Sequence, residues 1–556
     1  MASLWDYFGT REGEKGKASG LESYFLNDEP PPTDPSGQVE PSAVQYNEDM
    51  FYWAMRNLPV KEAAKHFLVC GAIGTGKTTT IDLFLQSIQS RFRPGRKRPE
   101  QLIVFDAKSE IVPKLNALGY SVELPNRSKK ERDESEEKNV WLLNPFDKRS
   151  CTWNISEAVE TPLMARHFAA LIVPEEPGST TPFFWSASRQ LVYAVIVGLF
   201  RSPTYARRKS WDLRDLLSAL ASRKRIEAIT SFDPRAKELA LGILNDKQHS
   251  DAVIASLATK LSRFEEVAAL WHATPEPRLF SIPKFLKKPG VLIIGNDPVF
   301  RESLWPINAM LLKSLAQEIL RGAETQEPRH WFVLDEFPAM ERVEAIQDLV
   351  NRGRSKGASV LIGIQGIDRL NEIYGQHGAN DLLEQLTHKT FFRAGGPATA
   401  QWIESFFGQY RRTEESYGTN RSKEGTSHST NWGTAERSMF LASFFMNLPF
   451  TGPGKPFVAV HDIPSLEKTV ITRRQFDEVN SWRVKPANVE AVMGRTSIFE
   501  QTLAGWDSTE AAEFCGNPSP AADPEAGDPP QESKSKPTKK SPPDDSLPRR
   551  KDQWPD

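Results

Sequence analysis

The stretch FLVCGAIGTGKTTTIDLFLQ, residues 67–86, decides the fold. Its first four apolar residues predict a short buried strand, and the amphipathic segment TTIDLFLQSI (79–88) predicts a helix. The turn between them, GAIGTGKT (71–78), fits the pattern of a phosphate-binding loop. Glycines let backbone N–H groups wrap around phosphates, and the start of the helix adds its positive end. The stretch therefore predicts nucleotide binding.

The residues of this loop have specific expected contacts. Lys77 is expected to neutralise the β- and γ-phosphates of ATP, and the Thr78 hydroxyl is expected to bind Mg²⁺. The residues expected to surround the nucleotide are Gly71, Ala72, Ile73, Gly74, Thr75, Gly76, Lys77, Thr78 and Thr79.

A second segment, HWFVLDEFPAM (330–340), predicts a strand that ends in two acids. In this kind of fold Asp335 would hold Mg²⁺ through water, and Glu336 would polarise the attacking water as a general base. Adjacent acids after an apolar strand favour hydrolysis over binding alone, and a solvated strand end is the alternative.

A third segment, NRGRSKGASVLIGIQ (351–365), predicts a strand that follows a basic turn and ends at Gln365. From the strand next to Asp335, Gln365 would reach the γ-phosphate. Arg354 is the candidate arginine that completes a neighbouring subunit's site in a ring, with a structural or DNA-contacting role as the alternative. Arg352 is the weaker candidate.

Short apolar runs recur along the chain and predict buried parallel strands with ligand chemistry at their carboxyl ends. These runs are 66–70, 101–106, 140–144, 291–295, 330–336, 359–365 and 389–394. Between 156 and 285 the apolar residues instead recur at three- and four-residue spacing, with Ser, Thr or Asp at expected helix N-caps. The predicted fold class is α/β, a mostly parallel sheet interrupted by an all-α inserted domain.

The predicted division of the chain has five parts, one of which is built from two segments. They are a flexible arm (1–45), the nucleotide-binding domain (46–155 and 286–480), the all-α domain (156–285), a C-terminal helical extension (481–515) and a disordered tail (516–556). The polar stretch 126–139 is expected to be an exposed turn. The stretch 411–438 is expected to be a long loop, either a lid or channel lining or a passive surface loop.

Composition sets limits on the partners and the compartment. The formal net charge is −2, which excludes a uniformly basic nucleic-acid coat, so any DNA contact must be local. Cys70, Cys151 and Cys515 have no metal-binding spacing and suit a reducing cytosol. The apolar run 191–200 is shorter than the ~18 residues that span a bilayer and is interpreted as a buried helix. A cytoplasmic protein is expected, held at the inner membrane only through a partner.

Two basic runs, RFRPGRKR (91–98) and SRKR (222–225), are either DNA contacts or solvated loops. The aromatic residues Phe183, Phe184 and Trp185 are expected to pack in a core.

Several ordered pieces give the chain a resemblance to the coupling-protein ATPases of type IV secretion and bacterial conjugation, within the RecA-like group of DNA pumps. These pieces are HFLVCGAIGTGKTTT (66–80), VFDAKSE (104–110), LLNPFDKRSCTWN (142–154), FFWSASRQLVYAV (183–195), LDEFPAM (334–340), Gly353–Arg354 and GIQGIDRLNEIYG (363–375). The resemblance covers about residues 45–475. Ser109 stands where the family signature has glycine, and a short polar arm stands where family members usually begin with transmembrane helices.

The resemblance implies a hexameric ring around DNA, with ATP at the subunit interfaces and the all-α domain where substrate enters. It makes Lys77, Thr78, Asp335, Glu336 and Gln365 the ATPase residues, and Arg354 the arginine finger. Asp106 and Lys108 match a family motif. Support of the phosphate site and a plain strand-end cap are both open for Asp106.

The resulting hypothesis is an ATP-driven motor that moves DNA, expected to be single-stranded, or nucleoprotein towards a transfer channel. Its implied partners are a relaxase, secretion-channel proteins and a membrane anchor. One alternative is a cytosolic DNA translocase or helicase of a mobile element or defence system, which the short polar arm favours. Another is an ATP-gated adaptor that recruits protein substrates, against which Glu336 and Arg354 argue.

Overall fold

The structure is a computed structural model of the chain. It describes residues 25–26, 49–96, 98–122, 139–175, 182–272, 279–297, 299–422, 425–464, 468–495 and 497–516. Of the predicted arm it describes only β1 (Phe25–Leu26), and of the predicted tail only Gly516. The predicted turn 126–139 lies outside the described residues except for Asn139.

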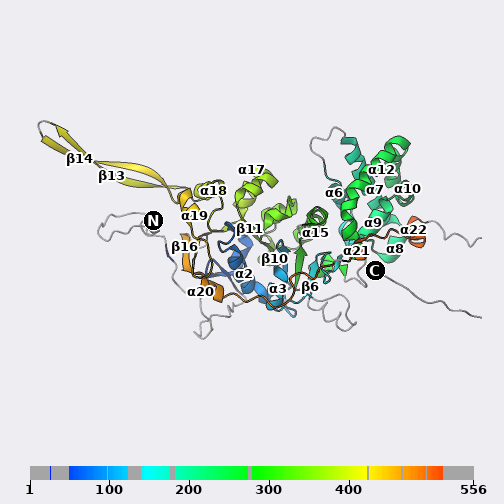
Figure 1. The fold of residues 1–556 in the computed structure, drawn as a ribbon, viewed down its shortest axis with the longest axis horizontal. Coiled ribbons are helices and arrows are strands. Elements are labelled where there is room, and N and C mark those ends of the chain that lie inside the picture. Colours follow the sequence, from blue (N-terminus) through cyan, green and yellow to red (C-terminus); the bar gives the residue numbers. More distant parts are fainter. Residues whose placement is uncertain are drawn as a thin grey trace, which may run out of the picture.

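A ten-stranded sheet in the order β1-β16-β15-β12-β4-β11-β10-β5-β9-β6 forms the centre of the molecule (Figure 1). Seven adjacent strands run parallel: β12 (His388–Phe391), β4 (Phe67–Cys70), β11 (Lys356–Ile364), β10 (Thr325–Leu334), β5 (Gln101–Asp106), β9 (Gly290–Gly295) and β6 (Val140–Leu143). These are the seven apolar runs of the sequence, which confirms the predicted parallel sheet. The antiparallel pair β15 (Pro456–Ile463) and β16 (Lys468–Gln475) extends it beyond β12.

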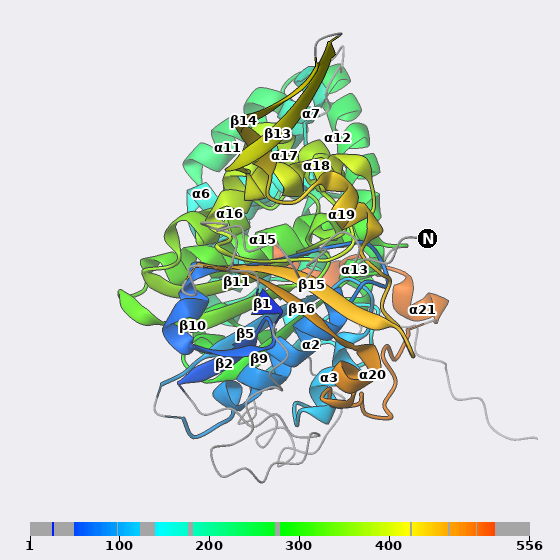
Figure 2. The ribbon, with the colours of Figure 1, turned by 90° about the vertical axis from the view of Figure 1, so that its left-hand side faces the viewer.

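The residues of β4 show how the sheet is covered on both faces. Phe67 and Val69 belong to one apolar core with helices α2 and α3, and Leu68 and Cys70 belong to a second core with α15, α16 and α17. Alternate residues of a strand point to opposite faces, so this near-continuous apolar sequence fits a strand buried on both sides. The two helical layers are visible in Figure 2. Their bounds are α2 (Lys77–Ile88), α3 (Ile111–Ala117), α15 (Arg301–Arg321), α16 (Glu344–Arg352) and α17 (Ile367–Gln385).

Residues 155–272, here called the helical region, lie between the paired short strands β7 (Thr152–Trp153) and β8 (Leu279–Phe280). Side-chain N-caps open several of the helices, as the sequence predicted; the capping residues are Thr161, Ser202, Asp212, Ser222 and Asp233. The helices are α5 (Ile155–Ala158), α6 (Pro162–Ile172), α7 (Pro182–Arg201), α8 (Pro203–Arg208), α9 (Leu213–Leu220), α10 (Arg223–Thr230), α11 (Pro234–Leu244), α12 (Lys247–Leu261) and α13 (Glu265–His272).

Helix α7 is the centre of the helical region and packs against α6, α9, α10, α11 and α12. Its segment Phe183–Arg201, with mean hydropathy 1.4, is the one helix among the described residues that is long and apolar enough to cross a membrane, and half of it is buried in the protein. Phe184 and Trp185 pack against the core as predicted. The prediction was wrong for Phe183, whose side chain is 51% exposed.

The predicted loop at 411–438 is instead an antiparallel hairpin of β13 (Gln409–Ser422) and β14 (Gly425–Ser438), which projects from the sheet domain (Figure 1). The sequence here is rich in Ser, Thr, Gly and charged residues and has no apolar alternation. Strand prediction depends on that alternation, so a hairpin of this composition is predicted as a loop.

After α20 (Phe476–Ser481), residues 482–516 form a segment, here called the strap, that runs from the sheet to the helical region. It contacts α2 through Val484 N, which donates to Gln86 Oε1 at 2.9 Å, and later contacts the helical region through Trp506 and Glu510. Within the predicted helical extension 481–515, its helices are α21 (Ile498–Gln501) and α22 (Ser508–Cys515).

Candidate nucleotide site

The phosphate loop joins β4 to α2 in a shape that requires glycine. Gly76 has φ +116°, and a Cβ atom there would lie 2.7 Å from the Phe457 ring and 2.8 Å from the Phe392 ring. A Cβ at Gly71 would lie 2.6 Å from Phe392 Cβ. Glycine therefore lets the loop close over the end of the sheet, where the N–H groups of Gly71 and Ala72 donate to the carbonyl oxygens of Ile364, at 3.2 Å, and Arg393, at 2.8 Å.

Lys77, the first residue of α2, is buried. Its Nζ donates to the carbonyl oxygens of Gly71, at 2.5 Å, and Ala72, at 3.1 Å. Burial lowers the pKa of Lys77, while the nearby Glu336 carboxylate partly opposes this. An ammonium group in this position is under-solvated and suits an anionic ligand at the mouth of the loop.

The other loop residues frame the same opening. The Thr75 hydroxyl donates to the Ala72 carbonyl at 2.8 Å and fixes the turn from inside. Thr78 is half-buried, Thr79 is buried, and Ile73 is 74% exposed. Gly74 accepts hydrogen bonds from Thr451 N and Oγ1, at 3.0 and 3.1 Å, so the segment before β15 supports the loop.

Asp335 and Glu336 directly follow β10, and Gln365 directly follows β11. Strand β11 lies between β10 and β4, so the acids, the glutamine and the phosphate loop meet at the carboxyl edge of three adjacent strands. Gln365 Nε2 donates to Glu336 Oε2 at 2.7 Å. The sequence predicted that Gln365 would end the strand beside Asp335, and the pairing of β10 with β11 confirms it.

Asp335 Oδ1 is buried and accepts no hydrogen bond within the described part of the chain. A carboxylate oxygen of this kind, with the Thr78 hydroxyl close in sequence to Lys77, fits the all-oxygen coordination that Mg²⁺ prefers when phosphates and water supply the other ligands. No cluster of three or more His, Cys, Asp or Glu suited to a metal occurs among the described residues. The donor set therefore fits a nucleotide-bound Mg²⁺ better than a metal held by protein ligands alone.

Lys108 is a member of the site that sequence reasoning left without a role. Its Nζ lies 3.5 Å from Asp335 Oδ2 and 3.9 Å from Glu336 Oε2. Asp106 holds the preceding turn, because its carboxylate accepts hydrogen bonds from the backbone N–H groups of Glu110, at 2.9 Å, and Ile111, at 3.1 Å. Asp106 thus caps the end of β5 and the start of α3, one of the two alternatives left open by the sequence.

Arg354 lies away from this group of residues. It is exposed in the turn before β11, whereas Gln365 follows the other end of that nine-residue strand. At about 3.3 Å per residue, the strand separates the two residues by roughly 30 Å. Arg352 and Arg354 make no ion pair with the described residues. Arg354 therefore lies far from the phosphate loop of the same chain.

The two basic runs make contacts within the protein. Arg91 is buried, lies 3.3 Å from Glu100 and stacks over the Trp331 ring at 5.6 Å. In the second run, Arg223 pairs with Glu227 at 2.8 Å, and Arg225 donates to the Ser218 carbonyl at 3.1 Å. Neither alternative, a DNA contact or a solvated loop, predicted these contacts within the protein; Lys97 lies outside the described residues.

Comparisons with known proteins agree with this geometry. A family model described as the type IV secretion-system coupling protein DNA-binding domain matches residues 53–465. Coupling protein TraD of Escherichia coli (strain K12) is 23% identical over 375 residues, which cover 65% of this chain and 47% of TraD. The chain thus spans about half the length of that relative.

Two structures of the conjugative coupling protein TrwB have a similar fold. The unbound form of TrwBdeltaN70 superposes with a TM-score of 0.58 at 17% identity, over 80% of this chain and 92% of that one. TrwB in complex with ADP and Mg²⁺ gives 0.57 at 16%, over 81% and 93%. This similarity confirms the predicted RecA-like P-loop fold. The family model spans most of the chain, and the chain belongs to the type IV secretion-system coupling protein family.

Proposed function

We propose that this protein is an ATP-driven motor that translocates DNA in conjugation or type IV secretion. The observation that carries the proposal is the convergence of Lys77, Glu336 and Gln365 at one edge of the sheet, with Gln365 donating to Glu336 at 2.7 Å. A protein that only binds nucleotide has no need for a carboxylate oriented in this way. Membership of the coupling-protein family supports DNA as the substrate that is moved.

In the proposed reaction each side chain has one task. Lys77 exchanges the carbonyl oxygens of Gly71 and Ala72 for phosphate oxygens of ATP. Glu336 accepts a proton from the attacking water, and Gln365 keeps the carboxylate of Glu336 oriented. Thr78 and Asp335 would hold Mg²⁺, which supplies neutralisation of phosphate charge when it is bound.

Arg354 is proposed to act on a neighbouring subunit in a hexameric ring. Its exposed position at the end of β11 remote from Gln365 suits a contact in trans. An arginine supplied by a neighbour stabilises the charge that develops on the transferred phosphate. Hydrolysis would then depend on assembly, and the proposed partners are DNA, a relaxase, and secretion-channel and membrane-anchor proteins.

The first test is the ATPase rate of the purified chain with and without single- and double-stranded DNA. Strong stimulation by DNA is expected for the native protein. Lys77→Ala is expected to lose nucleotide binding, and Glu336→Gln is expected to keep nucleotide binding and lose turnover. A slow rate that ignores DNA in an assembled hexamer would contradict the motor and favour an adaptor.

A subunit-mixing experiment tests Arg354. Arg354→Ala and Lys77→Ala subunits are each expected to be inactive alone. Mixed rings are expected to regain activity, because an intact site forms where the phosphate loop of the first variant meets the Arg354 of the second. No recovery in mixed rings of confirmed composition would contradict a role in trans.

A further inference from the structure

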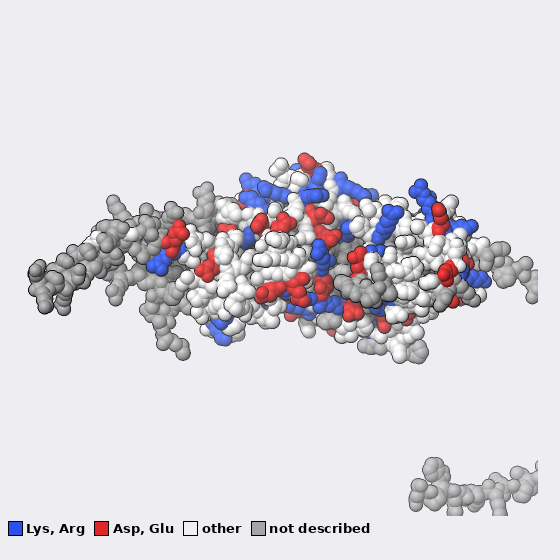
Figure 3. Space-filling view, turned by 90° about the horizontal axis from the view of Figure 1, so that it is seen from above, with Lys and Arg blue, Asp and Glu red and all other residues white. Residues whose placement is uncertain are grey.

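A charged groove of about 710 Å³ lies between the helical region and the helices that cover the sheet. Figure 3 shows the molecule from above, where basic and acidic side chains are interspersed over its surface. Four arginines from four different segments line the groove: Arg263, Arg301, Arg342 and Arg369. Three acids, Glu302, Glu341 and Glu372, face them. The cations exceed the anions by one, and each guanidinium carries five N–H donors.

Hydrogen-bond donors exceed acceptors in this groove. The Nε atoms of Arg263 and Arg301 are buried and have no partner among the described residues. Arg263 donates from Nη2 to the Ile172 carbonyl at 2.8 Å. Arg342 reaches Glu344 only at 3.7 Å and is 56% exposed. The two Nε atoms are too buried to meet a ligand, but the exposed Arg342 guanidinium donates no hydrogen bond to the described residues, and an additional oxygen-rich anion in the groove would satisfy its donors.

Glu341 occupies the centre of the arginine set. Its Oε1 accepts from Arg301 Nη2, and the same oxygen accepts from Arg369 Nη2 at 3.1 Å. The backbone of Glu341 has φ +56°, a left-handed conformation that side-chain-bearing residues seldom adopt. One strained glutamate thus places a single carboxylate oxygen between two guanidinium groups, as a phosphate oxygen would be placed.

The groove is connected directly to the nucleotide site. Glu341 follows the short helix η4 (Phe337–Met340), which begins immediately after Glu336. Arg369 lies in the first turn of α17, which begins two residues after Gln365. Tyr374 of α17 ties these two segments together, because its hydroxyl accepts a hydrogen bond from Val343 N at 3.0 Å. A displacement of Glu336 or Gln365 would therefore move Glu341 or Arg369 in the groove, because only a few residues separate them along the chain.

We propose that this groove binds the phosphodiester backbone of single-stranded DNA, and that Glu341 is a resident anion which a DNA phosphate displaces from Arg301 and Arg369. Planar guanidinium groups match phosphate oxygens in bidentate contacts. Binding through the backbone is independent of sequence, as a motor that moves along a strand requires. This inference rests on the proposed function.

The experiment measures the affinity of the full-length protein for a fluorescein-labelled oligothymidine over a series of salt concentrations. Arg301→Gln and Arg369→Gln are each expected to weaken binding about tenfold, and to reduce the slope of log affinity against log salt by about 0.7 for each phosphate that the variant no longer neutralises. Glu341→Gln is expected to tighten binding several-fold, because the competing charge is removed. Arg321→Gln, at the far end of α15 and paired with Glu318, is the matched control and is expected to bind like the native chain.

Opposite changes in DNA affinity, weaker for the arginine variants and tighter for Glu341→Gln, distinguish a binding site from a structural ion-pair network. If Glu341→Gln binds DNA no better than the native chain, or if the two arginine variants bind as tightly as the control, the inference is overturned. It is also overturned if the arginine variants lose the hexamer while their subunits keep native DNA affinity, since the groove is then a subunit contact. Absence of DNA binding by the native protein would instead refute the proposed function itself.

Discussion

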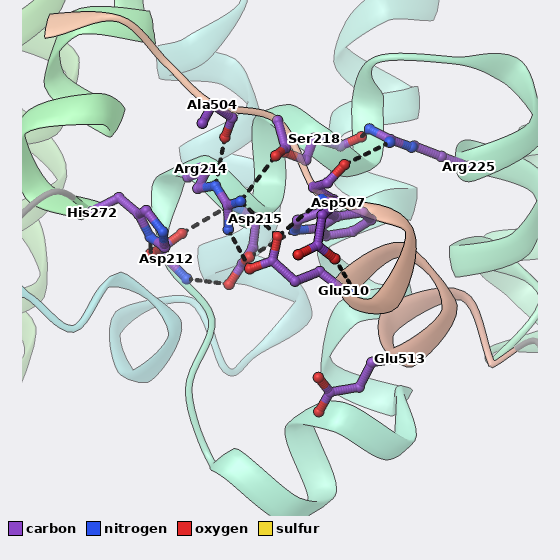
Figure 4. Close-up of polar contacts among 12 residues, drawn as sticks. Asp212, Arg214, Asp215, Ser218, Arg225, His272, Ala504, Asp507, Glu510 and Glu513 are labelled. Carbon is purple, nitrogen blue, oxygen red and sulfur yellow. Dashed lines mark hydrogen bonds and ion pairs between the residues drawn. The ribbon is translucent and has the colours of Figure 1, made fainter. Parts of the chain in front are cut away.

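Arg214 joins the strap to the helical region, and its replacement by Met is predicted to release the end of the strap. Arg214 is 5% exposed and makes four hydrogen bonds. Two go to the Glu510 carboxylate, at 2.8 and 2.7 Å, and two go to the carbonyl oxygens of Ala504, at 2.6 Å, and Gly505, at 3.0 Å. Figure 4 shows this cluster, in which Arg214 lies among residues 504–510 of the strap.

The magnitude follows from those contacts. Hydrogen bonds to a charged partner contribute about 1.5–3 kcal/mol each, and removal of one partner of a buried ion pair costs about 3–5 kcal/mol. Water reaches Glu510, which is 28% exposed, so the low end of the range for a buried ion pair, about 3 kcal/mol, applies. A loss of about 3 kcal/mol raises the open population of the strap end by about 10²-fold.

The assay is hydrogen exchange of the α22 amides in the full-length protein at pH 7. Arg214 lowers the pKa of Glu510 to about 2. Because this folded-state pKa is depressed, the pair stabilises the fold fully above about pH 4.5 and loses that effect only as the pH falls towards 2. Exchange at pH 7 therefore measures its full contribution.

The matched control is Arg207→Met. Arg207 also contacts α22, through an ion pair with Glu513 at 3.0 Å, but its side chain is 63% exposed. An exposed pair contributes about 0–1 kcal/mol, so exchange of α22 should change at most about fivefold. Unchanged protection in Arg214→Met, or equal loss of protection in the two variants, would refute the reasoning.

Three further predictions concern the phosphate loop, a buried acid and the pair Glu336–Gln365. Gly76→Ala should lower the free energy of unfolding by about 2–4 kcal/mol, measured by melting, and abolish nucleotide binding, measured by titration, because its Cβ would lie 2.7 Å from Phe457 at φ +116°. Gly74→Ala, with φ +73° and open space around the Cβ, should lower the free energy of unfolding by only about 1 kcal/mol. Burial, with the nearby Asp212 charge, raises the pKa of Asp215 to about 7. The protonated Asp215 side chain therefore stabilises the fold at low pH, and this stabilisation is lost as the pH rises through 7. Asp215→Asn should therefore remove about 1 kcal/mol of the fall in stability between pH 6 and 8, measured by melting at both values. Gln365→Leu should lower kcat about 10- to 100-fold with little change in KM, measured by steady-state ATPase assays, because Glu336 loses its orienting partner.

Each of these predictions has a contradicting outcome. Equal effects of the two glycine variants would show that steric contact is not what Gly76 avoids. An unchanged pH dependence in Asp215→Asn would show that another group titrates in this window. A rise in KM at native kcat would assign Gln365 to ground-state binding.

The arrangement of the candidate nucleotide site was largely predictable because its signals are local in sequence. The glycine spacing, Lys77 and the acid pair after an apolar strand each report a strand end or a turn within a few residues. Gln365 was also predictable, since the strand that carries it is strongly apolar. Its hydrogen bond to Glu336 required knowledge that β11 pairs with β10, which depends on contacts distant in sequence.

Other features left no comparable signal. Lys108 sits in a polar turn, and only the fold brings it beside Asp335 and Glu336. The hairpin β13–β14 has no apolar alternation, so its strands were predicted as a loop. The strap is held by side chains that bond backbone carbonyls, as Arg214 does, and such contacts depend on shape rather than on residue pattern.

One apolar core continues from the face of the sheet that α15, α16 and α17 cover into the helical region. It includes Leu68 of β4, Leu311 of α15, Phe168 of α6 and Leu191 of α7. A module that shares its interior with its host is not an independent folding unit, because excision would expose the apolar surface of both parts. During divergence, the helical region and α15 must therefore change together, and chimaeras between relatives should place their junctions outside this shared interior.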